Sequence, residues 1–366
     1  MRQDWILNSA ALALSFIGSL VVWAATQPRL IEFGLNPLTY LMRHTALIII
    51  GILLGVGVSR MRYTMLRAYV PIVYGLALIG IAAVPFIGKE INGIRAWFQL
   101  PLGFTLQPSE FMKIAIVIGV ALVLSETHHR HSEPGGREVI ISLAVAGVPM
   151  GLIMLQPDLG TTLVIAVFVL VLLAASGAHW KWLAGLGGFG SLGALVVLTV
   201  PGILSDYQRN RLLVFIDPSL DPLAAGYNLN QARLAIGTGG WTGTGLFNGP
   251  QTNGKFVPEQ QTDFIFSAAG EELGFLGGGL IIVLLAIVCW RGLKIAMESH
   301  DKFGQIAAAG IVGWIAFQTF ENIGMNIGLM PVTGVPLPFI SYGGSAMFAM
   351  WMAIGLLQNI KMKISD

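Results

Sequence analysis

This chain of 366 residues is poor in charge and in cysteine. Only 11% of its residues are charged, whereas an ordinary soluble domain has about 25%. A net charge of +2 and the lack of a dense basic run exclude a surface that tracks nucleic-acid phosphates. Cys289 is the only cysteine, so disulfides within the chain are excluded and any exposed loop must be held by packing and hydrogen bonds. The first apolar run lacks a basic leader and a small-residue cleavage site, so we expect it to be retained as a helix.

Apolar residues are abundant instead: they make up 55% of the chain, and the mean hydropathy is +0.74. Runs of about twenty apolar residues predict membrane-spanning helices. Ten such runs are present, which predicts an all-α, polytopic membrane protein with a ten-transmembrane-helix bundle. The runs cover roughly residues 6–26, 44–59, 68–87, 109–125, 138–155, 160–176, 183–203, 264–290, 305–325 and 344–359.

Lysine and arginine predict how the bundle is oriented, because basic residues in short loops stay on the cytoplasmic side. With both termini cytoplasmic, twelve of the 21 basic residues lie on that side and nine on the other. Four of the nine belong to the long loop of about residues 204–263, which is largely exempt from the rule. In the short segments, twelve basic residues therefore lie on the cytoplasmic side and five on the other. This difference predicts that the loop between the seventh and eighth helices is extracellular. We expect residues 1–366 to form a single membrane domain.

Asp263 stands where this large loop meets the eighth apolar run. An acid in so apolar a chain costs free energy unless it has a partner or a function. Two interpretations are open for its carboxylate: it caps the first turn of the helix, or it performs chemistry at the membrane surface.

Glu110 and Lys113 open the fourth run three residues apart, which places them on one helix face. They form either a salt bridge that joins helices, or an anion site in which Glu110 positions Lys113. Asp158, in the sequence Gln156-Pro157-Asp158-Leu159-Gly160 between the fifth and sixth runs, either stabilises that turn or adds an acid to the same outer face.

Three arginines add cations on the predicted extracellular side: Arg95, beside Trp97 in the second external loop, and Arg209 with Arg211 in the large loop. Paired arginines can be solvated, can contact lipid headgroups, or can grip a pyrophosphate bidentately. Glu271 follows Asp263 by eight residues, so it shares roughly the same helix face about 12 Å deeper. Either Glu271 or the adjacent Glu272 can pair with Lys113 or with an arginine and so hold helices together.

Two segments have unusual backbone requirements. Residues 237–245 are rich in glycine but lack the preceding strand and following Lys-Ser/Thr of a nucleotide-binding loop, so we expect them to fold tightly against the bundle. Residues 331–345, which include Ser341, are broken by prolines at the outer membrane edge, where only protein or a wet cavity can shield them. They are therefore predicted to form a cavity wall, and the whole outer face suits an anionic, lipid-linked substrate. The candidate substrate-binding residues are Arg95, Glu110, Lys113, Asp158, Arg209, Arg211, Glu271 and Ser341.

These motifs together resemble the SEDS family of cell-wall polymerases, which includes RodA, FtsW and their sporulation relatives. The resemblance covers nearly the whole chain. It is carried by Gln107-Pro108-Ser109-Glu110, Gln156-Pro157-Asp158-Leu159-Gly160, Asp217-Pro218 with Asp221-Pro222, Ala235-Ile236-Gly237 through Gly245, Pro258-Glu259 with Thr262-Asp263-Phe264, Glu271-Glu272-Leu273-Gly274 and Ile340-Ser341-Tyr342-Gly343-Gly344-Ser345.

The resemblance implies a peptidoglycan glycosyltransferase of the bacterial inner membrane that polymerises lipid II into glycan strands, for cell elongation and shape. It implies a class B penicillin-binding protein as transpeptidase partner, besides membrane lipids and undecaprenyl pyrophosphate-linked glycan. Asp263 matches the family's catalytic Asp. Gln261 stands where many relatives carry His, so no role of that His is carried over. The segment 208–211 and the sequence Pro-Glu-Gln-Gln-Thr-Asp that ends at Asp263 resemble RodA more than FtsW.

Such a reaction inverts the anomeric centre, so one base is enough, and Asp263 is the candidate. Lys113, Arg209 and Arg211, with Arg95 behind them, are candidates to stabilise the leaving pyrophosphate. No ligand spacing demands a cofactor, although a divalent cation such as magnesium or manganese near Asp158 is compatible with this chemistry.

Two other classes of function are compatible with intramembrane charges: a lipid II flippase or other transporter of a lipid-linked substrate, and a scaffold that recruits a penicillin-binding protein. A carrier needs access from both faces, whereas the polar groups here gather on the outer one.

Overall fold

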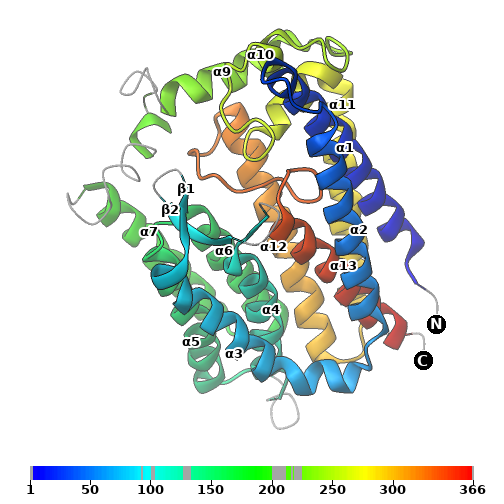
Figure 1. Ribbon diagram of the computed structural model, residues 1–366. Helices are drawn as coiled ribbons and strands as arrows, with labels where there is room; N and C mark the ends of the chain where they lie inside the picture. Colours follow the sequence, from blue (N-terminus) through cyan, green and yellow to red (C-terminus); the bar gives the residue numbers. More distant parts are fainter. Residues whose placement is uncertain are drawn as a thin grey trace.

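The computed structural model of the chain describes residues 3–91, 94–99, 104–126, 133–199, 212–215, 217 and 225–364. Within them the chain forms a bundle of long helices (Figure 1). Their bounds are α1 Trp5–Glu32, α2 Thr39–Arg60, α3 Tyr63–Ile87, α4 Pro108–Glu126, α5 Gly136–Met154, α6 Leu159–Ser176, α7 Trp180–Thr199, α11 Ile265–Glu298, α12 Lys302–Ile327 and α13 Gly344–Ile364. Each of them overlaps one predicted apolar run, in the same order.

Eight helices among the described residues are long and apolar enough to cross a membrane; these are the helices above other than α7 and α13. The prediction of a polytopic membrane protein is thereby confirmed. α4 and α12 lie innermost, since the most apolar stretches of these two helices are 78% and 67% buried, against 17% for α3. α12 packs on α4, α6 and α11. A helix that is apolar all round and exposed, as α3 is, suits a lipid surface.

Both termini lie at one end of the bundle (Figure 1). The Arg291 guanidinium, in the last turns of α11, bonds the Asp4 carboxylate at 2.5 Å, and Gln358 of α13 accepts the Asp4 N–H at 2.8 Å. α11 runs from this end to Ile265, where Asp263 precedes it. Asp263 and the termini therefore lie at opposite ends of the bundle.

The expectation of helices alone is wrong in one place, the connection between α3 and α4. It holds a small antiparallel sheet of β1 Lys89–Ile91, β2 Ile94–Gln99 and β3 Thr105–Leu106, in the order β1-β2-β3. Strands of two to six residues are invisible to a search for runs of about twenty apolar residues. Their pairing satisfies main-chain N–H and C=O groups in a segment that leaves the bundle.

α11 is broken at Gly274, whose backbone has φ 68° and ψ −167°. In an unbroken helix the N–H groups of Phe275 and Leu276 would donate to the carbonyls of Glu271 and Glu272. The break frees all four groups within an apolar helix, where an unpaired main-chain group is costly.

The glycine-rich segment, residues 237–245, supplies new partners for these four groups. It connects α9 (Ala225–Thr238) to α10 (Pro250–Asn253) and lies against α11, as the sequence predicts. The four bonds are Phe275 N–H to Gly240 O at 2.9 Å, Leu276 N–H to Trp241 O at 3.1 Å, Thr244 N–H to Glu271 O at 3.0 Å and Gly245 N–H to Glu272 O at 3.1 Å. The segment therefore completes the hydrogen bonding of a membrane helix.

Replacing Gly274 with alanine is expected to destabilise the protein by about 3 kcal/mol or more. The region of φ and ψ that Gly274 occupies is almost restricted to glycine and costs other residues about 1–3 kcal/mol, and a Cβ here would also overlap the main chain of Gly243. Gly279→Ala is the matched control, because a Cβ at that helical position meets nothing within 4 Å. Thermal unfolding in detergent measures both; equal midpoints would contradict the expectation.

Candidate functional site

Asp263 lies partly exposed in a turn directly before α11. The N-cap residue of α11 is Phe264, which has no side-chain cap, and the third helical amide, Ser267 N–H, donates to Asn326 Oδ1 of α12 at 3.1 Å. A side chain of another helix thus caps this amide, which does not need Asp263. The chemical interpretation of the carboxylate stays a prediction.

The main chain of Asp263 is held from three directions. Its carbonyl accepts Asn322 Nδ2 at 2.9 Å and Asn326 Nδ2 at 3.2 Å, and its N–H donates to the Glu259 carbonyl at 3.2 Å. Asn322 and Asn326 are both fully buried. The position of Asp263 is therefore fixed by α12 and by its own turn.

Residues 331–343 lie alongside this turn. Ser341 Oγ donates to the Thr262 carbonyl at 2.6 Å and accepts the Leu337 N–H at 2.7 Å, and Tyr342 N–H donates to the Gln261 carbonyl at 2.9 Å. Burial raises the pKa of the Tyr342 hydroxyl. The buried hydroxyl of Ser341, a candidate substrate-binding residue, thus joins two main-chain segments.

Glu110 and Lys113 form the salt bridge that their spacing predicts, with Nζ and Oε1 2.7 Å apart. Lys113 also donates to Gln318 Oε1 at 2.9 Å and lies 4.9 Å from the Trp314 ring centroid. Neither Lys113 nor Glu110 is more than 2% exposed. Lys113 therefore acts within the bundle, not at an open surface.

Polar residues of α12 were missed in the sequence. Gln318, Glu321, Asn322 and Asn326 are all fully buried, and Glu321 lies within electrostatic reach of Lys113 and Asp158. The available signal was their spacing inside an apolar run: residues three, four and eight positions after Gln318 lie on one side of a helix. α12 thus adds a polar stripe to the site.

Asp158 is the N-cap of α6, which agrees with the turn interpretation. Its carboxylate accepts Thr161 N–H at 2.9 Å and Thr161 Oγ1 at 2.8 Å. Gln107 Nε2, from the segment before α4, donates to the same carboxylate at 3.3 Å. Asp158 therefore ties α6 to the start of α4, the helix that carries Lys113.

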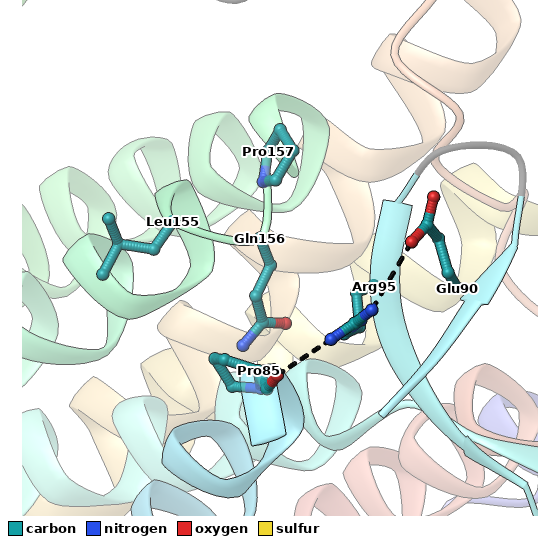
Figure 2. Close-up of a pocket in the computed structure, with 6 residues that line it drawn as sticks. All are labelled: Pro85, Glu90, Arg95, Leu155, Gln156 and Pro157. Carbon is teal, nitrogen blue, oxygen red and sulfur yellow. Dashed lines mark hydrogen bonds and ion pairs between the residues drawn. The ribbon is translucent and has the colours of Figure 1, made fainter. Parts of the chain in front are cut away.

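Arg95 lies on β2 at the edge of a pocket of about 220 Å³ (Figure 2). It donates to the Pro85 carbonyl at 3.2 Å and lies 3.6 Å from the Glu90 carboxylate. The pocket is lined by Pro85, Glu90, Arg95, Leu155, Gln156 and Pro157. Arg95 thus faces the turn that contains Asp158. Arg209 and Arg211 lie outside the described residues.

Among the described residues, Glu271 pairs neither with Lys113 nor with an arginine. Its carboxylate accepts Gln251 N–H at 2.7 Å, Thr252 N–H at 2.8 Å and Thr252 Oγ1 at 2.6 Å. These two amides are free donors at the start of α10, so Glu271 caps that short helix from α11. Glu271 holds the large loop in place instead of contacting Lys113, whose partner is Glu110.

Replacing Glu271 with glutamine is expected to destabilise the loop by about 1.5–3 kcal/mol, because a carboxamide cannot accept all three bonds with its single oxygen. Protease cleavage between α9 and α11 and the thermal midpoint measure the effect. Glu272→Gln is the matched control, since Glu272 accepts one bond, from Phe247 N–H at 3.3 Å. Equal cleavage of the two variants would show that the cap does not hold the loop.

In the part of the chain that the structure describes, no three His, Cys, Asp or Glu side chains come together to hold a metal ion.

Sequence comparison matches residues 4–366 to the family described as cell cycle protein, FtsW/RodA/SpoVE. Stage V sporulation protein E of Bacillus subtilis (strain 168) is 40% identical over 288 residues, which are 77% of this chain and 75% of that protein. Peptidoglycan glycosyltransferase MrdB of Escherichia coli (strain K12) is 33% identical over 353 residues, 95% of this chain and 90% of that protein.

Solved structures match over the whole chain as well. One described as "Structural coordination of polymerization and crosslinking by a peptidoglycan synthase complex" aligns with a TM-score of 0.83 and 28% identity, covering 100% of this chain and 99% of that one. The crystal structure of the rod shape determining protein RodA of Thermus thermophilus aligns with a TM-score of 0.73 and 25% identity, at the same coverage. The RodA neighbour agrees with the predicted closeness to RodA.

Proposed function

This chain belongs to the FtsW, RodA and SpoVE family, and on that premise we propose that it is a peptidoglycan glycosyltransferase that polymerises lipid II into glycan strands for cell elongation and shape. The observation that carries the proposal is the match of residues 4–366, which includes every residue of the site described above. The geometry of that site supports it: the main chain of an acid is held at the mouth of a helix by Asn322, and a buried cation is held by Gln318, one turn away on α12.

The proposed topology has ten membrane spans within one domain of residues 1–366, in the bacterial inner membrane, with both termini cytoplasmic. α7 and α13, with 20 and 21 residues, are long enough to add to the eight apolar spans. Basic residues gather at the end that holds the termini, among them Arg291, Lys361 and Lys363. The positive-inside rule then puts Asp263 and the large loop outside the cytoplasm.

Asp263 is the proposed general base. It takes the proton from the 4-hydroxyl of the acceptor GlcNAc while that oxygen attacks C1 of the donor sugar. The bond between O4 and C1 forms, the bond from C1 to the diphosphate oxygen breaks, and undecaprenyl diphosphate leaves with the electron pair. Because the donor sugar is α-linked and the glycan product is β-linked, a single displacement with inversion is sufficient. The carboxylate must come within about 3 Å of the attacking oxygen.

Positive groups stabilise the charge that gathers on the leaving diphosphate. Arg209 and Arg211 are the proposed direct contacts, and Arg95 lies on the outer rim beside the Asp158 turn. Lys113, fixed by Glu110 and Gln318, contributes its charge from inside the bundle. A magnesium or manganese ion in this reaction would take most of its ligands from the diphosphate oxygens.

The remaining residues predicted to bind substrate serve by building the site. Glu110 orients Lys113, Asp158 joins α6 to the start of α4, Glu271 caps α10, and Ser341 fixes the segment beside Thr262. A class B penicillin-binding protein is the proposed partner; a neighbouring structure described as a peptidoglycan synthase complex supports it.

Purified protein incubated with labelled lipid II tests this function directly. Moenomycin in the assay silences contaminating glycosyltransferases of the other class, and the reaction is run with and without a class B penicillin-binding protein. We expect labelled glycan polymer. Movement of lipid II across vesicle membranes without polymer would identify a carrier instead, and activity confined to the partner would identify a scaffold.

A further inference from the structure

α12 carries three carboxamides at intervals of four residues: Gln318, Asn322 and Asn326. This set, here called the amide ladder, is fully buried inside a helix otherwise rich in apolar residues. Residues at i, i+4 and i+8 lie nearly on one helix face and here span about 12 Å. Burying three amides is costly unless each is hydrogen-bonded, so their partners show what the ladder holds.

Its partners are the two groups that the proposed reaction needs most. At one end Gln318 accepts from Lys113 Nζ at 2.9 Å and donates to the Pro336 carbonyl at 2.8 Å. At the other end Asn322 donates to the carbonyls of Asp263 (2.9 Å) and Val335 (2.8 Å). One rigid helix therefore sets the separation between the Lys113 ammonium and the main chain of Asp263.

Asn326 adds a second constraint at the same end. Its Nδ2 donates to the Asp263 carbonyl at 3.2 Å, while its Oδ1 accepts the Ser267 N–H at 3.1 Å. A single side chain thus holds both the turn that presents Asp263 and the first turn of α11. Together the two asparagines fix the direction in which the Cα–Cβ bond of Asp263 leaves the main chain.

We propose that Asn322 and Asn326 are positioning residues for Asp263, whose carbonyl they clamp so that the carboxylate meets the acceptor hydroxyl in register with Lys113. The inference rests on the proposed function. A general base must come within about 3 Å of the proton it removes, and a misplacement of about 1 Å can cost 100-fold in rate.

Asn322→Leu and Asn326→Leu test the proposal, since leucine has the same branched arrangement of four side-chain heavy atoms as asparagine but is bulkier and has no donor. We expect kcat for lipid II polymerisation to fall about 10-fold to 100-fold in each, with KM within about two-fold of wild type, because the clamp acts on the base and not on substrate binding. Asn322→Ala and Asn326→Ala leave a cavity instead of a misfit, and they give the same contrast if a leucine variant does not fold.

Asn359→Leu is the matched control. Asn359 is also a buried asparagine whose Nδ2 donates to main-chain carbonyls, those of Val58, Ser59 and Met61, but it lies at the end of the bundle that holds the termini. Its loss should lower the thermal midpoint as much as the ladder variants do, while kcat stays within about two-fold. Ladder variants that match Asn359→Leu in both midpoint and kcat would overturn the proposal.

The parallel assay of Asp263→Asn separates this inference from the function on which it rests. If Asp263→Asn is inactive while the ladder variants are fully active, the positioning role is rejected and the role of Asp263 as base is kept. An active Asp263→Asn rejects the base itself.

Discussion

Replacing Asp263 with asparagine is expected to lower the rate of lipid II polymerisation by about 1,000-fold, within the range of 10²–10⁴ that a general base contributes. The variant keeps the size of the side chain and the main-chain carbonyl that Asn322 and Asn326 hold. The negative charge and the ability to accept a proton are lost. Single-turnover polymerisation of labelled lipid II measures the rate, and the thermal midpoint should stay close to wild type.

Asp301→Asn is the control for this substitution. Asp301 also precedes a long helix, as the N-cap of α12, and its side chain accepts the Gly304 N–H at 3.2 Å. It lies at the opposite end of the bundle, next to Tyr63 and Lys363. Asparagine caps helices about as well as aspartate, so the rate should change by less than about two-fold. Polymerisation by Asp263→Asn at more than a tenth of the wild-type rate would remove Asp263 from the role of base.

Replacing Lys113 with methionine is expected to destabilise the protein by about 3–5 kcal/mol and to lower polymerisation at least about 100-fold. The stability cost arises because Glu110, 2% exposed, loses its only ionic partner among the described residues. The loss of rate arises because a fixed positive charge no longer acts on the departing diphosphate. Chemical or thermal unfolding in detergent measures the first, and the lipid II assay the second.

A double variant separates these two effects. Lys113→Met combined with Glu110→Gln removes both charges from the bundle, and replacing a buried ion pair by neutral groups is often nearly neutral for stability. We expect the double variant to regain most of the lost stability and to remain about 100-fold slower than wild type. Recovery of both stability and rate would mean that the pair only joins α4 to its neighbours.

The helices were predictable because a membrane span must satisfy its main-chain hydrogen bonds internally and present apolar side chains to lipid. The length and apolar composition of a run therefore fix the position of the helix. Asp263 could also be placed, because it stands where a polar loop meets an apolar run. The three short strands of residues 89–106 escaped because strands of that size carry no such constraint.

The site was predicted less completely for a different reason. The sequence search followed charge, which found Glu110 with Lys113 but gave no weight to the uncharged Gln318, Asn322 and Asn326. The same preference gave Glu271 an ionic partner, whereas its real partners are main-chain amides twenty and nineteen residues earlier. Main-chain amides occur at every residue and carry no side-chain charge. The sequence therefore does not show which of them bond to a given carboxylate, whereas the folded structure does.

The break at Gly274 has a mechanical consequence. Since the glycine-rich segment shares four hydrogen bonds with α11, the segment and the upper turns of that helix form one stiff body. α9, which leads into the segment, also packs on α11 and α12. A force applied to α9 is therefore expected to displace the turn that carries Asp263 together with these helices.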